Sequence, residues 1–68
     1  MKAMSGRNQL TGRVISVKLG DIMAEIVMQV GENTITSVIT RGSAESMELK
    51  VGDEVTALIK STEVMLLK

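Results

Sequence analysis

Two short segments of this 68-residue chain combine residue types that hold small anions. One spans residues 5–9 (SGRNQ), the other spans residues 60–62 (KST), and Thr40 offers one further hydroxyl. Arginine presents a planar fork of N–H donors, lysine a compact positive charge, and serine and threonine add neutral donors. Such groups bind an anion through charge and hydrogen bonds without reacting with it. The pattern therefore predicts a binding site for a small oxyanion.

Each of these segments also has an ordinary structural explanation. Residues 5–9 fit a solvated N-terminal stretch, and residues 60–62 fit a plain turn with turn-forming hydroxyls. Thr40 fits a strand position filled by a residue of high β-propensity. Residue type and spacing alone leave both interpretations open.

The composition excludes most catalytic chemistry. The chain has no His, no Cys and no aromatic residue. Disulfides, Cys/His zinc sites, and catalysis by His or Cys are therefore excluded. The carboxylates fall in predicted turns or on predicted solvated faces, with no acid/base pairing. We expect no catalytic residue, no metal site and no enzymatic activity.

The charge balance argues against two kinds of partner. Eight Lys and Arg residues offset eight Asp and Glu residues. The chain therefore has no net positive charge to attract the phosphates of a nucleic acid. Single-strand binders of the OB type also stack bases on aromatic rings, which are missing here. No apolar run approaches the roughly 18–20 residues of a membrane span, and no leader pattern precedes a cleavage site. We expect a cytoplasmic protein with no nucleic-acid and no membrane partner.

The hydrophobic pattern predicts an all-β fold. Period-2 alternation and β-branched residues mark strands, and Gly-containing turns separate them. A short helix is expected within residues 41–50, with Ser43 as its N-cap. The expected strands cover residues 7–19, 22–30, 34–40, 54–60 and 62–68. Five strands with one helix between the third and fourth match a partly open Greek-key barrel of the OB type; a two-sheet sandwich is the alternative.

The same pattern predicts self-association. A chain this short buries only about 60% of its unfolded surface, so its own core is small. Met23, Val27, Met65 and Leu67 lie on faces opposite the expected core stripes, and contiguous apolar surface of this kind marks interfaces. We expect one domain over residues 1–68 that associates with further copies.

Three stretches of the sequence resemble a known family. SGRNQLTGRV at residues 5–14 closely resembles the S-A-R-N-Q-x-x-G opening of the molbindin (Mop) family of small molybdate-binding proteins. The resemblance continues through ITSVIT at residues 35–40 and through residues 43–66, so it covers nearly the whole chain. Gly6 is a departure, because alanine is usual there.

The resemblance implies a stand-alone molbindin. Such a protein binds molybdate, and tungstate as well, for intracellular molybdenum storage and homeostasis, and does so without catalysis. The family forms homohexamers built from dimers and holds oxyanions between subunits. Carried over by position, Ser5 and Arg7 contact the anion. Thr40, Lys60 and Ser61 complete the same pocket, with the opening segment supplied by a neighbouring chain.

Two other functions stay open at this point. One is an interaction module that only mediates assembly or senses a ligand for another protein. The other is an OB-type nucleic-acid binder, which the missing aromatic rings and the zero net charge disfavour.

Overall fold

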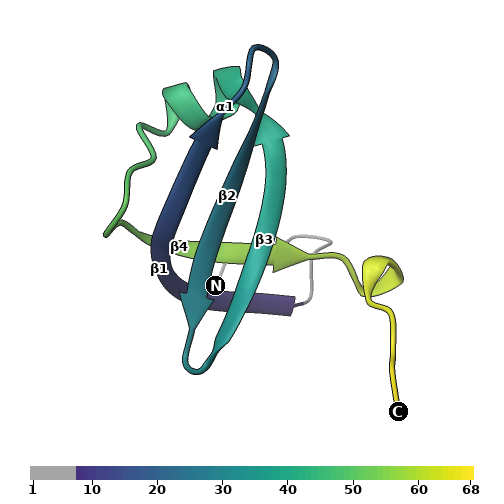
Figure 1. The fold of residues 1–68 in the computed structure, drawn as a ribbon. Coiled ribbons are helices and arrows are strands. Elements are labelled where there is room, and N and C mark those ends of the chain that lie inside the picture. The colour runs from purple at the N-terminus through teal and green to yellow at the C-terminus, as the bar shows by residue number, and fades with distance from the viewer. Residues whose placement is uncertain (1–7) are drawn as a thin grey trace.

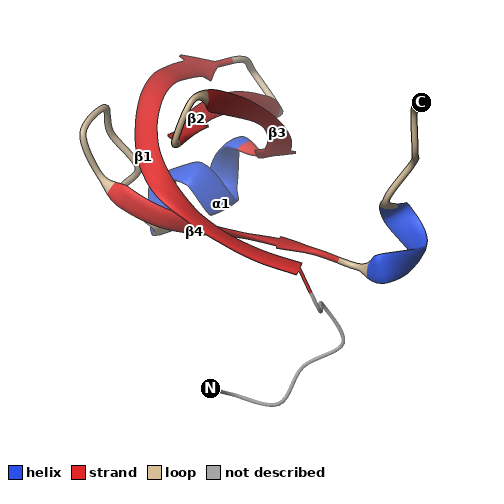
Figure 2. Ribbon diagram, turned by 90° about the horizontal axis from the view of Figure 1, so that it is seen from below, coloured by secondary structure: helices blue, strands red, loops and turns tan. Residues whose placement is uncertain are grey.

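The computed structural model describes residues 8–68, which form four strands, one short α-helix and one 3₁₀ turn. The elements in chain order are β1 (Asn8–Leu19), β2 (Met23–Val30), β3 (Asn33–Thr40), α1 (Arg41–Ser46), β4 (Glu54–Ile59) and η1 (Ser61–Glu63). All strand pairs are antiparallel, in the sheet order β3-β2-β1-β4. The sheet curls strongly, and α1 lies at one end of the curl (Figures 1 and 2).

The curl originates in β1, which has two successive partners. Its first half, Asn8–Arg13, pairs with β4, and its second half pairs with β2 from Arg13 onward. The register shifts between Val14 and Ser16, which is a β-bulge or irregularity of the kind that bends a strand. The change of direction in β1 is plain in Figure 1.

Gly12 permits this bend because β2 lies directly against it. A Cβ at position 12 would lie 2.1 Å from the Gln29 carbonyl oxygen and 2.8 Å from the Val30 Cγ2. No side chain larger than hydrogen fits there unless the backbone moves. The bend or bulge predicted at Gly12 lies close to the observed register shift, which falls between Val14 and Ser16.

The core is small and aliphatic. Its buried residues are Val14, Ala24, Ile26, Met28 and Ala44. Three of them alternate along β2, as the period-2 pattern predicts. Ala44 comes from α1, so the helix closes one end of the curled sheet over this core.

Two glycines in tight turns adopt backbone dihedral angles of the left-handed region. Gly31, in the β2–β3 hairpin, has φ of 59°, and Gly52, before β4, has φ of 99°. Glycine adopts such angles without steric cost. The positive φ predicted for Gly52 is confirmed.

The helix begins earlier than predicted. Thr40 is the N-cap of α1: its backbone is extended, and its side chain accepts a hydrogen bond from the Ser43 backbone N–H. The prediction of Ser43 as N-cap is therefore wrong. An N-cap has non-helical dihedral angles, and the last residue of β3 already meets that condition, so the helix starts at once at Arg41.

The strand expected at residues 62–68 is not formed in the single chain. Ser61–Glu63 form η1, and the residues after it have no regular structure. Met65, Leu66 and Leu67 are 92%, 94% and 99% exposed. A strand needs a paired neighbour, and this segment pairs with none of the four strands formed by residues 8–59. The OB-like fold class holds with four strands of the curled sheet.

Substitution of Gly12 by alanine tests the origin of the bend. We expect Gly12→Ala to lower the free energy of unfolding by about 1–3 kcal/mol or more, because the new methyl overlaps a backbone carbonyl. Gly42→Ala is the matched control, because nothing lies within 4 Å of the point that its Cβ would occupy and a helical alanine is favourable. Urea unfolding at one fixed protein concentration gives both values. Equal midpoints for Gly12→Ala and the wild type would contradict this explanation.

Candidate functional site

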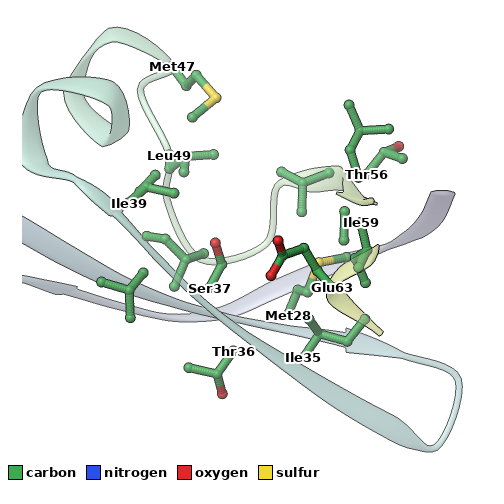
Figure 3. Close-up of a pocket in the computed structure, with 15 residues that line it drawn as sticks. Met28, Ile35, Thr36, Ser37, Ile39, Met47, Leu49, Thr56, Ile59 and Glu63 are labelled. Atoms are coloured by element: carbon green, nitrogen blue, oxygen red, sulfur yellow. The ribbon is translucent and has the colours of Figure 1, made fainter. Parts of the chain in front are cut away.

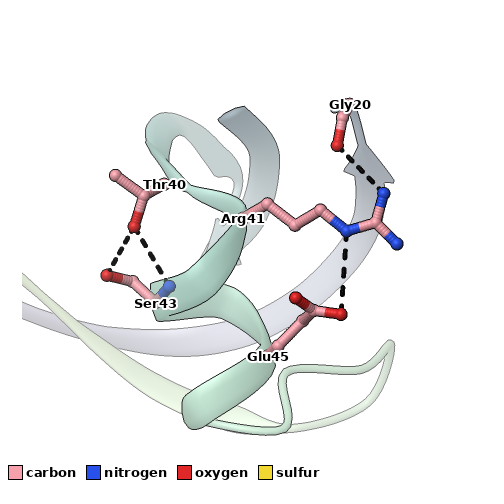
Figure 4. A network of polar contacts seen from close by, with 5 residues as sticks. All are labelled: Gly20, Thr40, Arg41, Ser43 and Glu45. Carbon is pink, nitrogen blue, oxygen red and sulfur yellow. Dashed lines mark hydrogen bonds and ion pairs between the residues drawn. The ribbon is translucent and has the colours of Figure 1, made fainter. Parts of the chain in front are cut away.

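Thr40 and Ser43 form a pair of hydroxyls at the junction of β3 and α1. The Thr40 Oγ1 accepts the Ser43 N–H at 3.0 Å and donates to the Ser43 Oγ at 2.8 Å (Figure 4). Thr40 thus donates its single hydroxyl proton to Ser43, and the Ser43 O–H has no acceptor among residues 8–68. Both residues are exposed. The junction can therefore offer a hydroxyl donor to an anion through Ser43, which the sequence pattern indicates only as a helix cap.

Arg41 anchors this junction to the turn between β1 and β2. Its guanidinium donates to the Gly20 carbonyl at 3.1 Å and lies 3.6 Å from the Glu45 carboxylate (Figure 4). Its backbone N–H also donates to the Ile22 carbonyl at 2.7 Å. Because Glu45 partly neutralises the guanidinium, Arg41 acts here as a structural clamp more than as a free positive charge.

Lys60 and Ser61 lie where the chain leaves β4. Lys60 has an extended backbone and is the N-cap of η1, and its carbonyl accepts the Glu63 N–H at 2.9 Å. Both side chains are exposed. Within residues 8–68, the Lys60 ammonium has no carboxylate partner. This corner therefore offers a positive charge and a hydroxyl that are both available to a ligand.

A single chain does not bring Thr40 next to Lys60. Ile59, which precedes Lys60, pairs with Asn8 at the first end of β1. Thr40 follows Ile39, whose β2 partner Ala24 pairs with Leu19 at the last end of β1. The two hydroxyl-bearing corners therefore lie at opposite ends of the longest strand. Ser5 and Arg7, the other predicted anion contacts, lie outside the described residues.

One hollow of the described chain is an apolar groove and not an anion site. It has a volume of about 710 Å³ and opens between β3 and β4 (Figure 3). Residues from β2, the segment after α1, and β4 complete its apolar lining. Glu63 is the only charged residue in that lining, and its charge is negative. A dianion would find no positive partner there.

Two further features bear on the site. Among residues 8–68, no group of three or more acidic side chains is placed to hold a cation. No helix in the same part of the chain is long and apolar enough to cross a membrane.

The family follows from a match that spans nearly the whole sequence. A model of the TOBE domain matches residues 4–66. This chain belongs to the TOBE domain family. It is 50% identical over 66 residues to molybdenum-pterin-binding protein 1 of Clostridium pasteurianum, a match that covers 96% of this chain and 97% of that protein. The resemblance to the molbindin (Mop) family is thereby confirmed.

Solved structures agree with this TOBE domain over nearly its full length. A molybdate-binding protein from Sporomusa ovata has a TM-score of 0.94 and 40% identity, covering 98% of this chain and 100% of that one. The cytoplasmic molybdate-binding protein ModG, solved with molybdate bound, has a TM-score of 0.88 and 32% identity. That match covers 94% of this chain and 46% of ModG. The predicted fold class is confirmed by both likenesses.

Thr40 has a structural role that can be separated from ligand binding. We expect Thr40→Ala to lower the free energy of unfolding by about 0.5–2 kcal/mol without any anion present, because the Ser43 N–H loses its acceptor. Thr40→Ser keeps the acceptor and should retain most of the stability. Thermal unfolding in anion-free buffer measures both. If Thr40→Ala has the same melting temperature as the wild type, the capping role is refuted.

Proposed function

We propose that this protein binds molybdate, and tungstate as well, as an intact oxyanion, without catalysis. The main support is the 50% identity to a molybdenum-pterin-binding protein over almost the full length of both chains. The ModG structure with molybdate bound, which shares the fold, adds to it. The role is intracellular molybdenum storage and homeostasis, in the cytoplasm, by a single molbindin-type domain over residues 1–68.

The chemistry of the available side chains suits a tetrahedral dianion. Molybdate requires converging donors and no reacting group. Arg7 and Lys60 supply two positive charges, and the hydroxyls of Ser5 and Ser61 supply neutral donors. Because the whole chain has a formal charge of zero, the attraction comes from this local arrangement. Partial burial between chains would strengthen each contact, provided that the charges compensate one another.

We place the pocket at a seam between copies of the chain. Arg7 directly precedes Asn8 in the sequence, Lys60 directly follows Ile59, and Asn8 pairs with Ile59. The Asn8 side-chain amide also donates to the Ile59 carbonyl at 3.2 Å. The pairing fixes the end of β1 from which the opening segment, with Ser5 and Arg7, would reach the pocket of a neighbouring chain. Thr40, at the far end of β1, joins the site only from another chain.

The proposed assembly is a homohexamer built from dimers. Its support within the chain is the amount of apolar side chain left at the surface. Ile22, Val38 and Val51 are 75%, 62% and 65% exposed, although the described residues bury only five side chains in the core. Association would remove such side chains from water, at about 25 cal/mol per Å² of apolar surface.

Calorimetric titration tests the function directly. We expect saturable heat when molybdate or tungstate is added, and much weaker binding of sulfate and phosphate at the same concentrations. Sulfate has the same charge and shape as molybdate but is smaller. Discrimination between the two anions would therefore come from the size of the pocket. No saturable heat with any of the four anions would contradict the proposal and favour an assembly module. Tight binding of single-stranded DNA or RNA at low salt would instead favour the nucleic-acid function.

Substitution of Lys60 tests the position of the anion pocket most sharply. We expect Lys60→Ala to weaken molybdate binding by about tenfold or more, because a charge-assisted hydrogen bond is lost. Lys18→Ala is the matched control: Lys18 is also an exposed strand-end cation, but it lies opposite Glu25 on β2. Calorimetry measures both affinities, and light scattering checks that the assembly persists. Equal affinities of the two variants would place the pocket elsewhere.

A further inference from the structure

We propose that Asn8 is a positioning residue of the anion site: its side-chain amide fixes the direction in which Lys60 leaves β4. This role rests on the proposed function, in which the Lys60 ammonium contacts the anion. It adds a residue that acts on that contact without touching the ligand. Asn8 is the first residue of β1, and Lys60 directly follows Ile59, the last residue of β4.

The residue type at position 8 is a poor choice for a strand. Asparagine is depleted in β-strands, where β-branched and aromatic residues are preferred. Asn8 is also exposed, so burial does not select it. Its amide nonetheless has a specific partner, because the side-chain Nδ2 donates to the Ile59 carbonyl at 3.2 Å. This hydrogen bond gives asparagine a role here that strand propensity and burial do not.

The acceptor of this hydrogen bond belongs to the peptide group that joins Ile59 to Lys60. A peptide group is planar and trans, so holding its carbonyl also fixes its N–H and the Cα of the next residue. The backbone of Asn8 already pairs with Ile59, and the side-chain amide adds a second contact at the same point. The described β1–β4 ladder ends at this pair. The extra contact therefore restrains the place where the chain leaves the sheet.

A second hydrogen bond holds the peptide group on the other side of Lys60. The Glu63 N–H donates to the Lys60 carbonyl at 2.9 Å, where η1 begins. Lys60 has φ of −66° and ψ of 142°, and these two angles relate two peptide groups that are each held by a hydrogen bond. The Cβ of Lys60 is attached to the Cα between them, so its direction is set before a ligand arrives. Such preorganisation lowers the entropic cost of binding.

The two hydrogen bonds matter because a lysine side chain is itself flexible. Lys60 is exposed, and its ammonium has no carboxylate partner among residues 8–68 to restrain it. A lysine is a point charge on a flexible four-carbon stem, so the described backbone contacts fix only the start of that stem. Loss of the contact to the Ile59 carbonyl would let the corner turn and spread the ammonium over a larger volume. Because charge-assisted hydrogen bonds depend on distance and angle, the affinity for an anion would fall.

Another exposed hydrogen bond between the same two strands offers the matched control. The hydroxyls of Thr11 and Thr56 lie 3.0 Å apart, three residues along β1 from Asn8. Thr11→Ala removes this bond, just as Asn8→Ala removes the amide bond, and both positions are exposed. The two substitutions differ in how far from Lys60 they act. A difference between them in anion affinity therefore reports on the Lys60 corner and not on the pairing of β1 with β4.

A double-mutant cycle tests whether Asn8 acts through Lys60. Calorimetry gives the molybdate affinity of the wild type, Asn8→Ala, Lys60→Ala, the double variant Asn8→Ala/Lys60→Ala and Thr11→Ala, and light scattering confirms equal assembly. We expect Asn8→Ala to weaken binding by about three- to tenfold in the wild-type background. The same change should cost less than about twofold when Lys60 is already alanine, because no ammonium is left to position. Thr11→Ala should also change the affinity by less than about twofold.

Backbone nitrogen-15 relaxation adds a measurement that needs no anion. We expect the order parameters of the Lys60 and Ser61 amides to be lower in Asn8→Ala than in the wild type. Thr11→Ala should keep the wild-type values. Unchanged order parameters in Asn8→Ala would overturn the proposal, because the corner would then be held without the Asn8 amide.

The affinities can overturn the proposal independently. An equal loss from Asn8→Ala in both backgrounds would make Asn8 a direct ligand instead of a positioning residue, and equal affinities of Asn8→Ala and Thr11→Ala would leave it no role at the site. Either result, obtained with normal molybdate binding by the wild type, rejects the positioning role alone. Absence of saturable heat with the wild type rejects the proposed function, and with it any role of Asn8 at an anion site.

Discussion

One constraint shapes the molecule: β1 pairs with β4 through its first half and with β2 through its second half. The strand must bend to do so, and Gly12 gives it the room, because the Gln29 carbonyl fills the space of any side chain. The bend curls four strands around a core of five buried residues. It also leaves β3 and β4 as the two ends of the described sheet, so the barrel of a single chain stays open.

The open barrel relates the fold to the proposed function. Because the bent strand is long, it holds Thr40 and Lys60 at opposite ends, and neither corner alone presents enough donors for a dianion. An interface between copies can bring such corners together and lower the local dielectric around them. The apolar groove and the exposed side chains of Met65, Leu66 and Leu67 would supply the driving force for that interface. In this account the charged residues select the ligand, and the apolar residues assemble the site.

Much of the local structure could be predicted from the sequence. The alternation of Ala24, Ile26 and Met28 identifies the core face of β2, and Gly52 marks a left-handed turn. Features that depend on the pairing of strands far apart in the sequence could not be predicted in this way. Residues 62–68 have the composition of a strand but find no partner among the described strands, and the helix is capped by Thr40 because of where β3 ends. The candidate residues came from a family motif; their proposed grouping would need neighbouring copies, which no local pattern encodes.

The central claim is that one oxyanion is held by groups from different copies of the chain. Crystals grown with molybdate, measured with anomalous scattering at the molybdenum edge, test it most directly. The account predicts a molybdenum peak within hydrogen-bonding reach of the Lys60 ammonium and the Ser61 hydroxyl, with at least one contact from a second chain. A peak whose contacts all come from one chain, or one remote from Lys60, would contradict it.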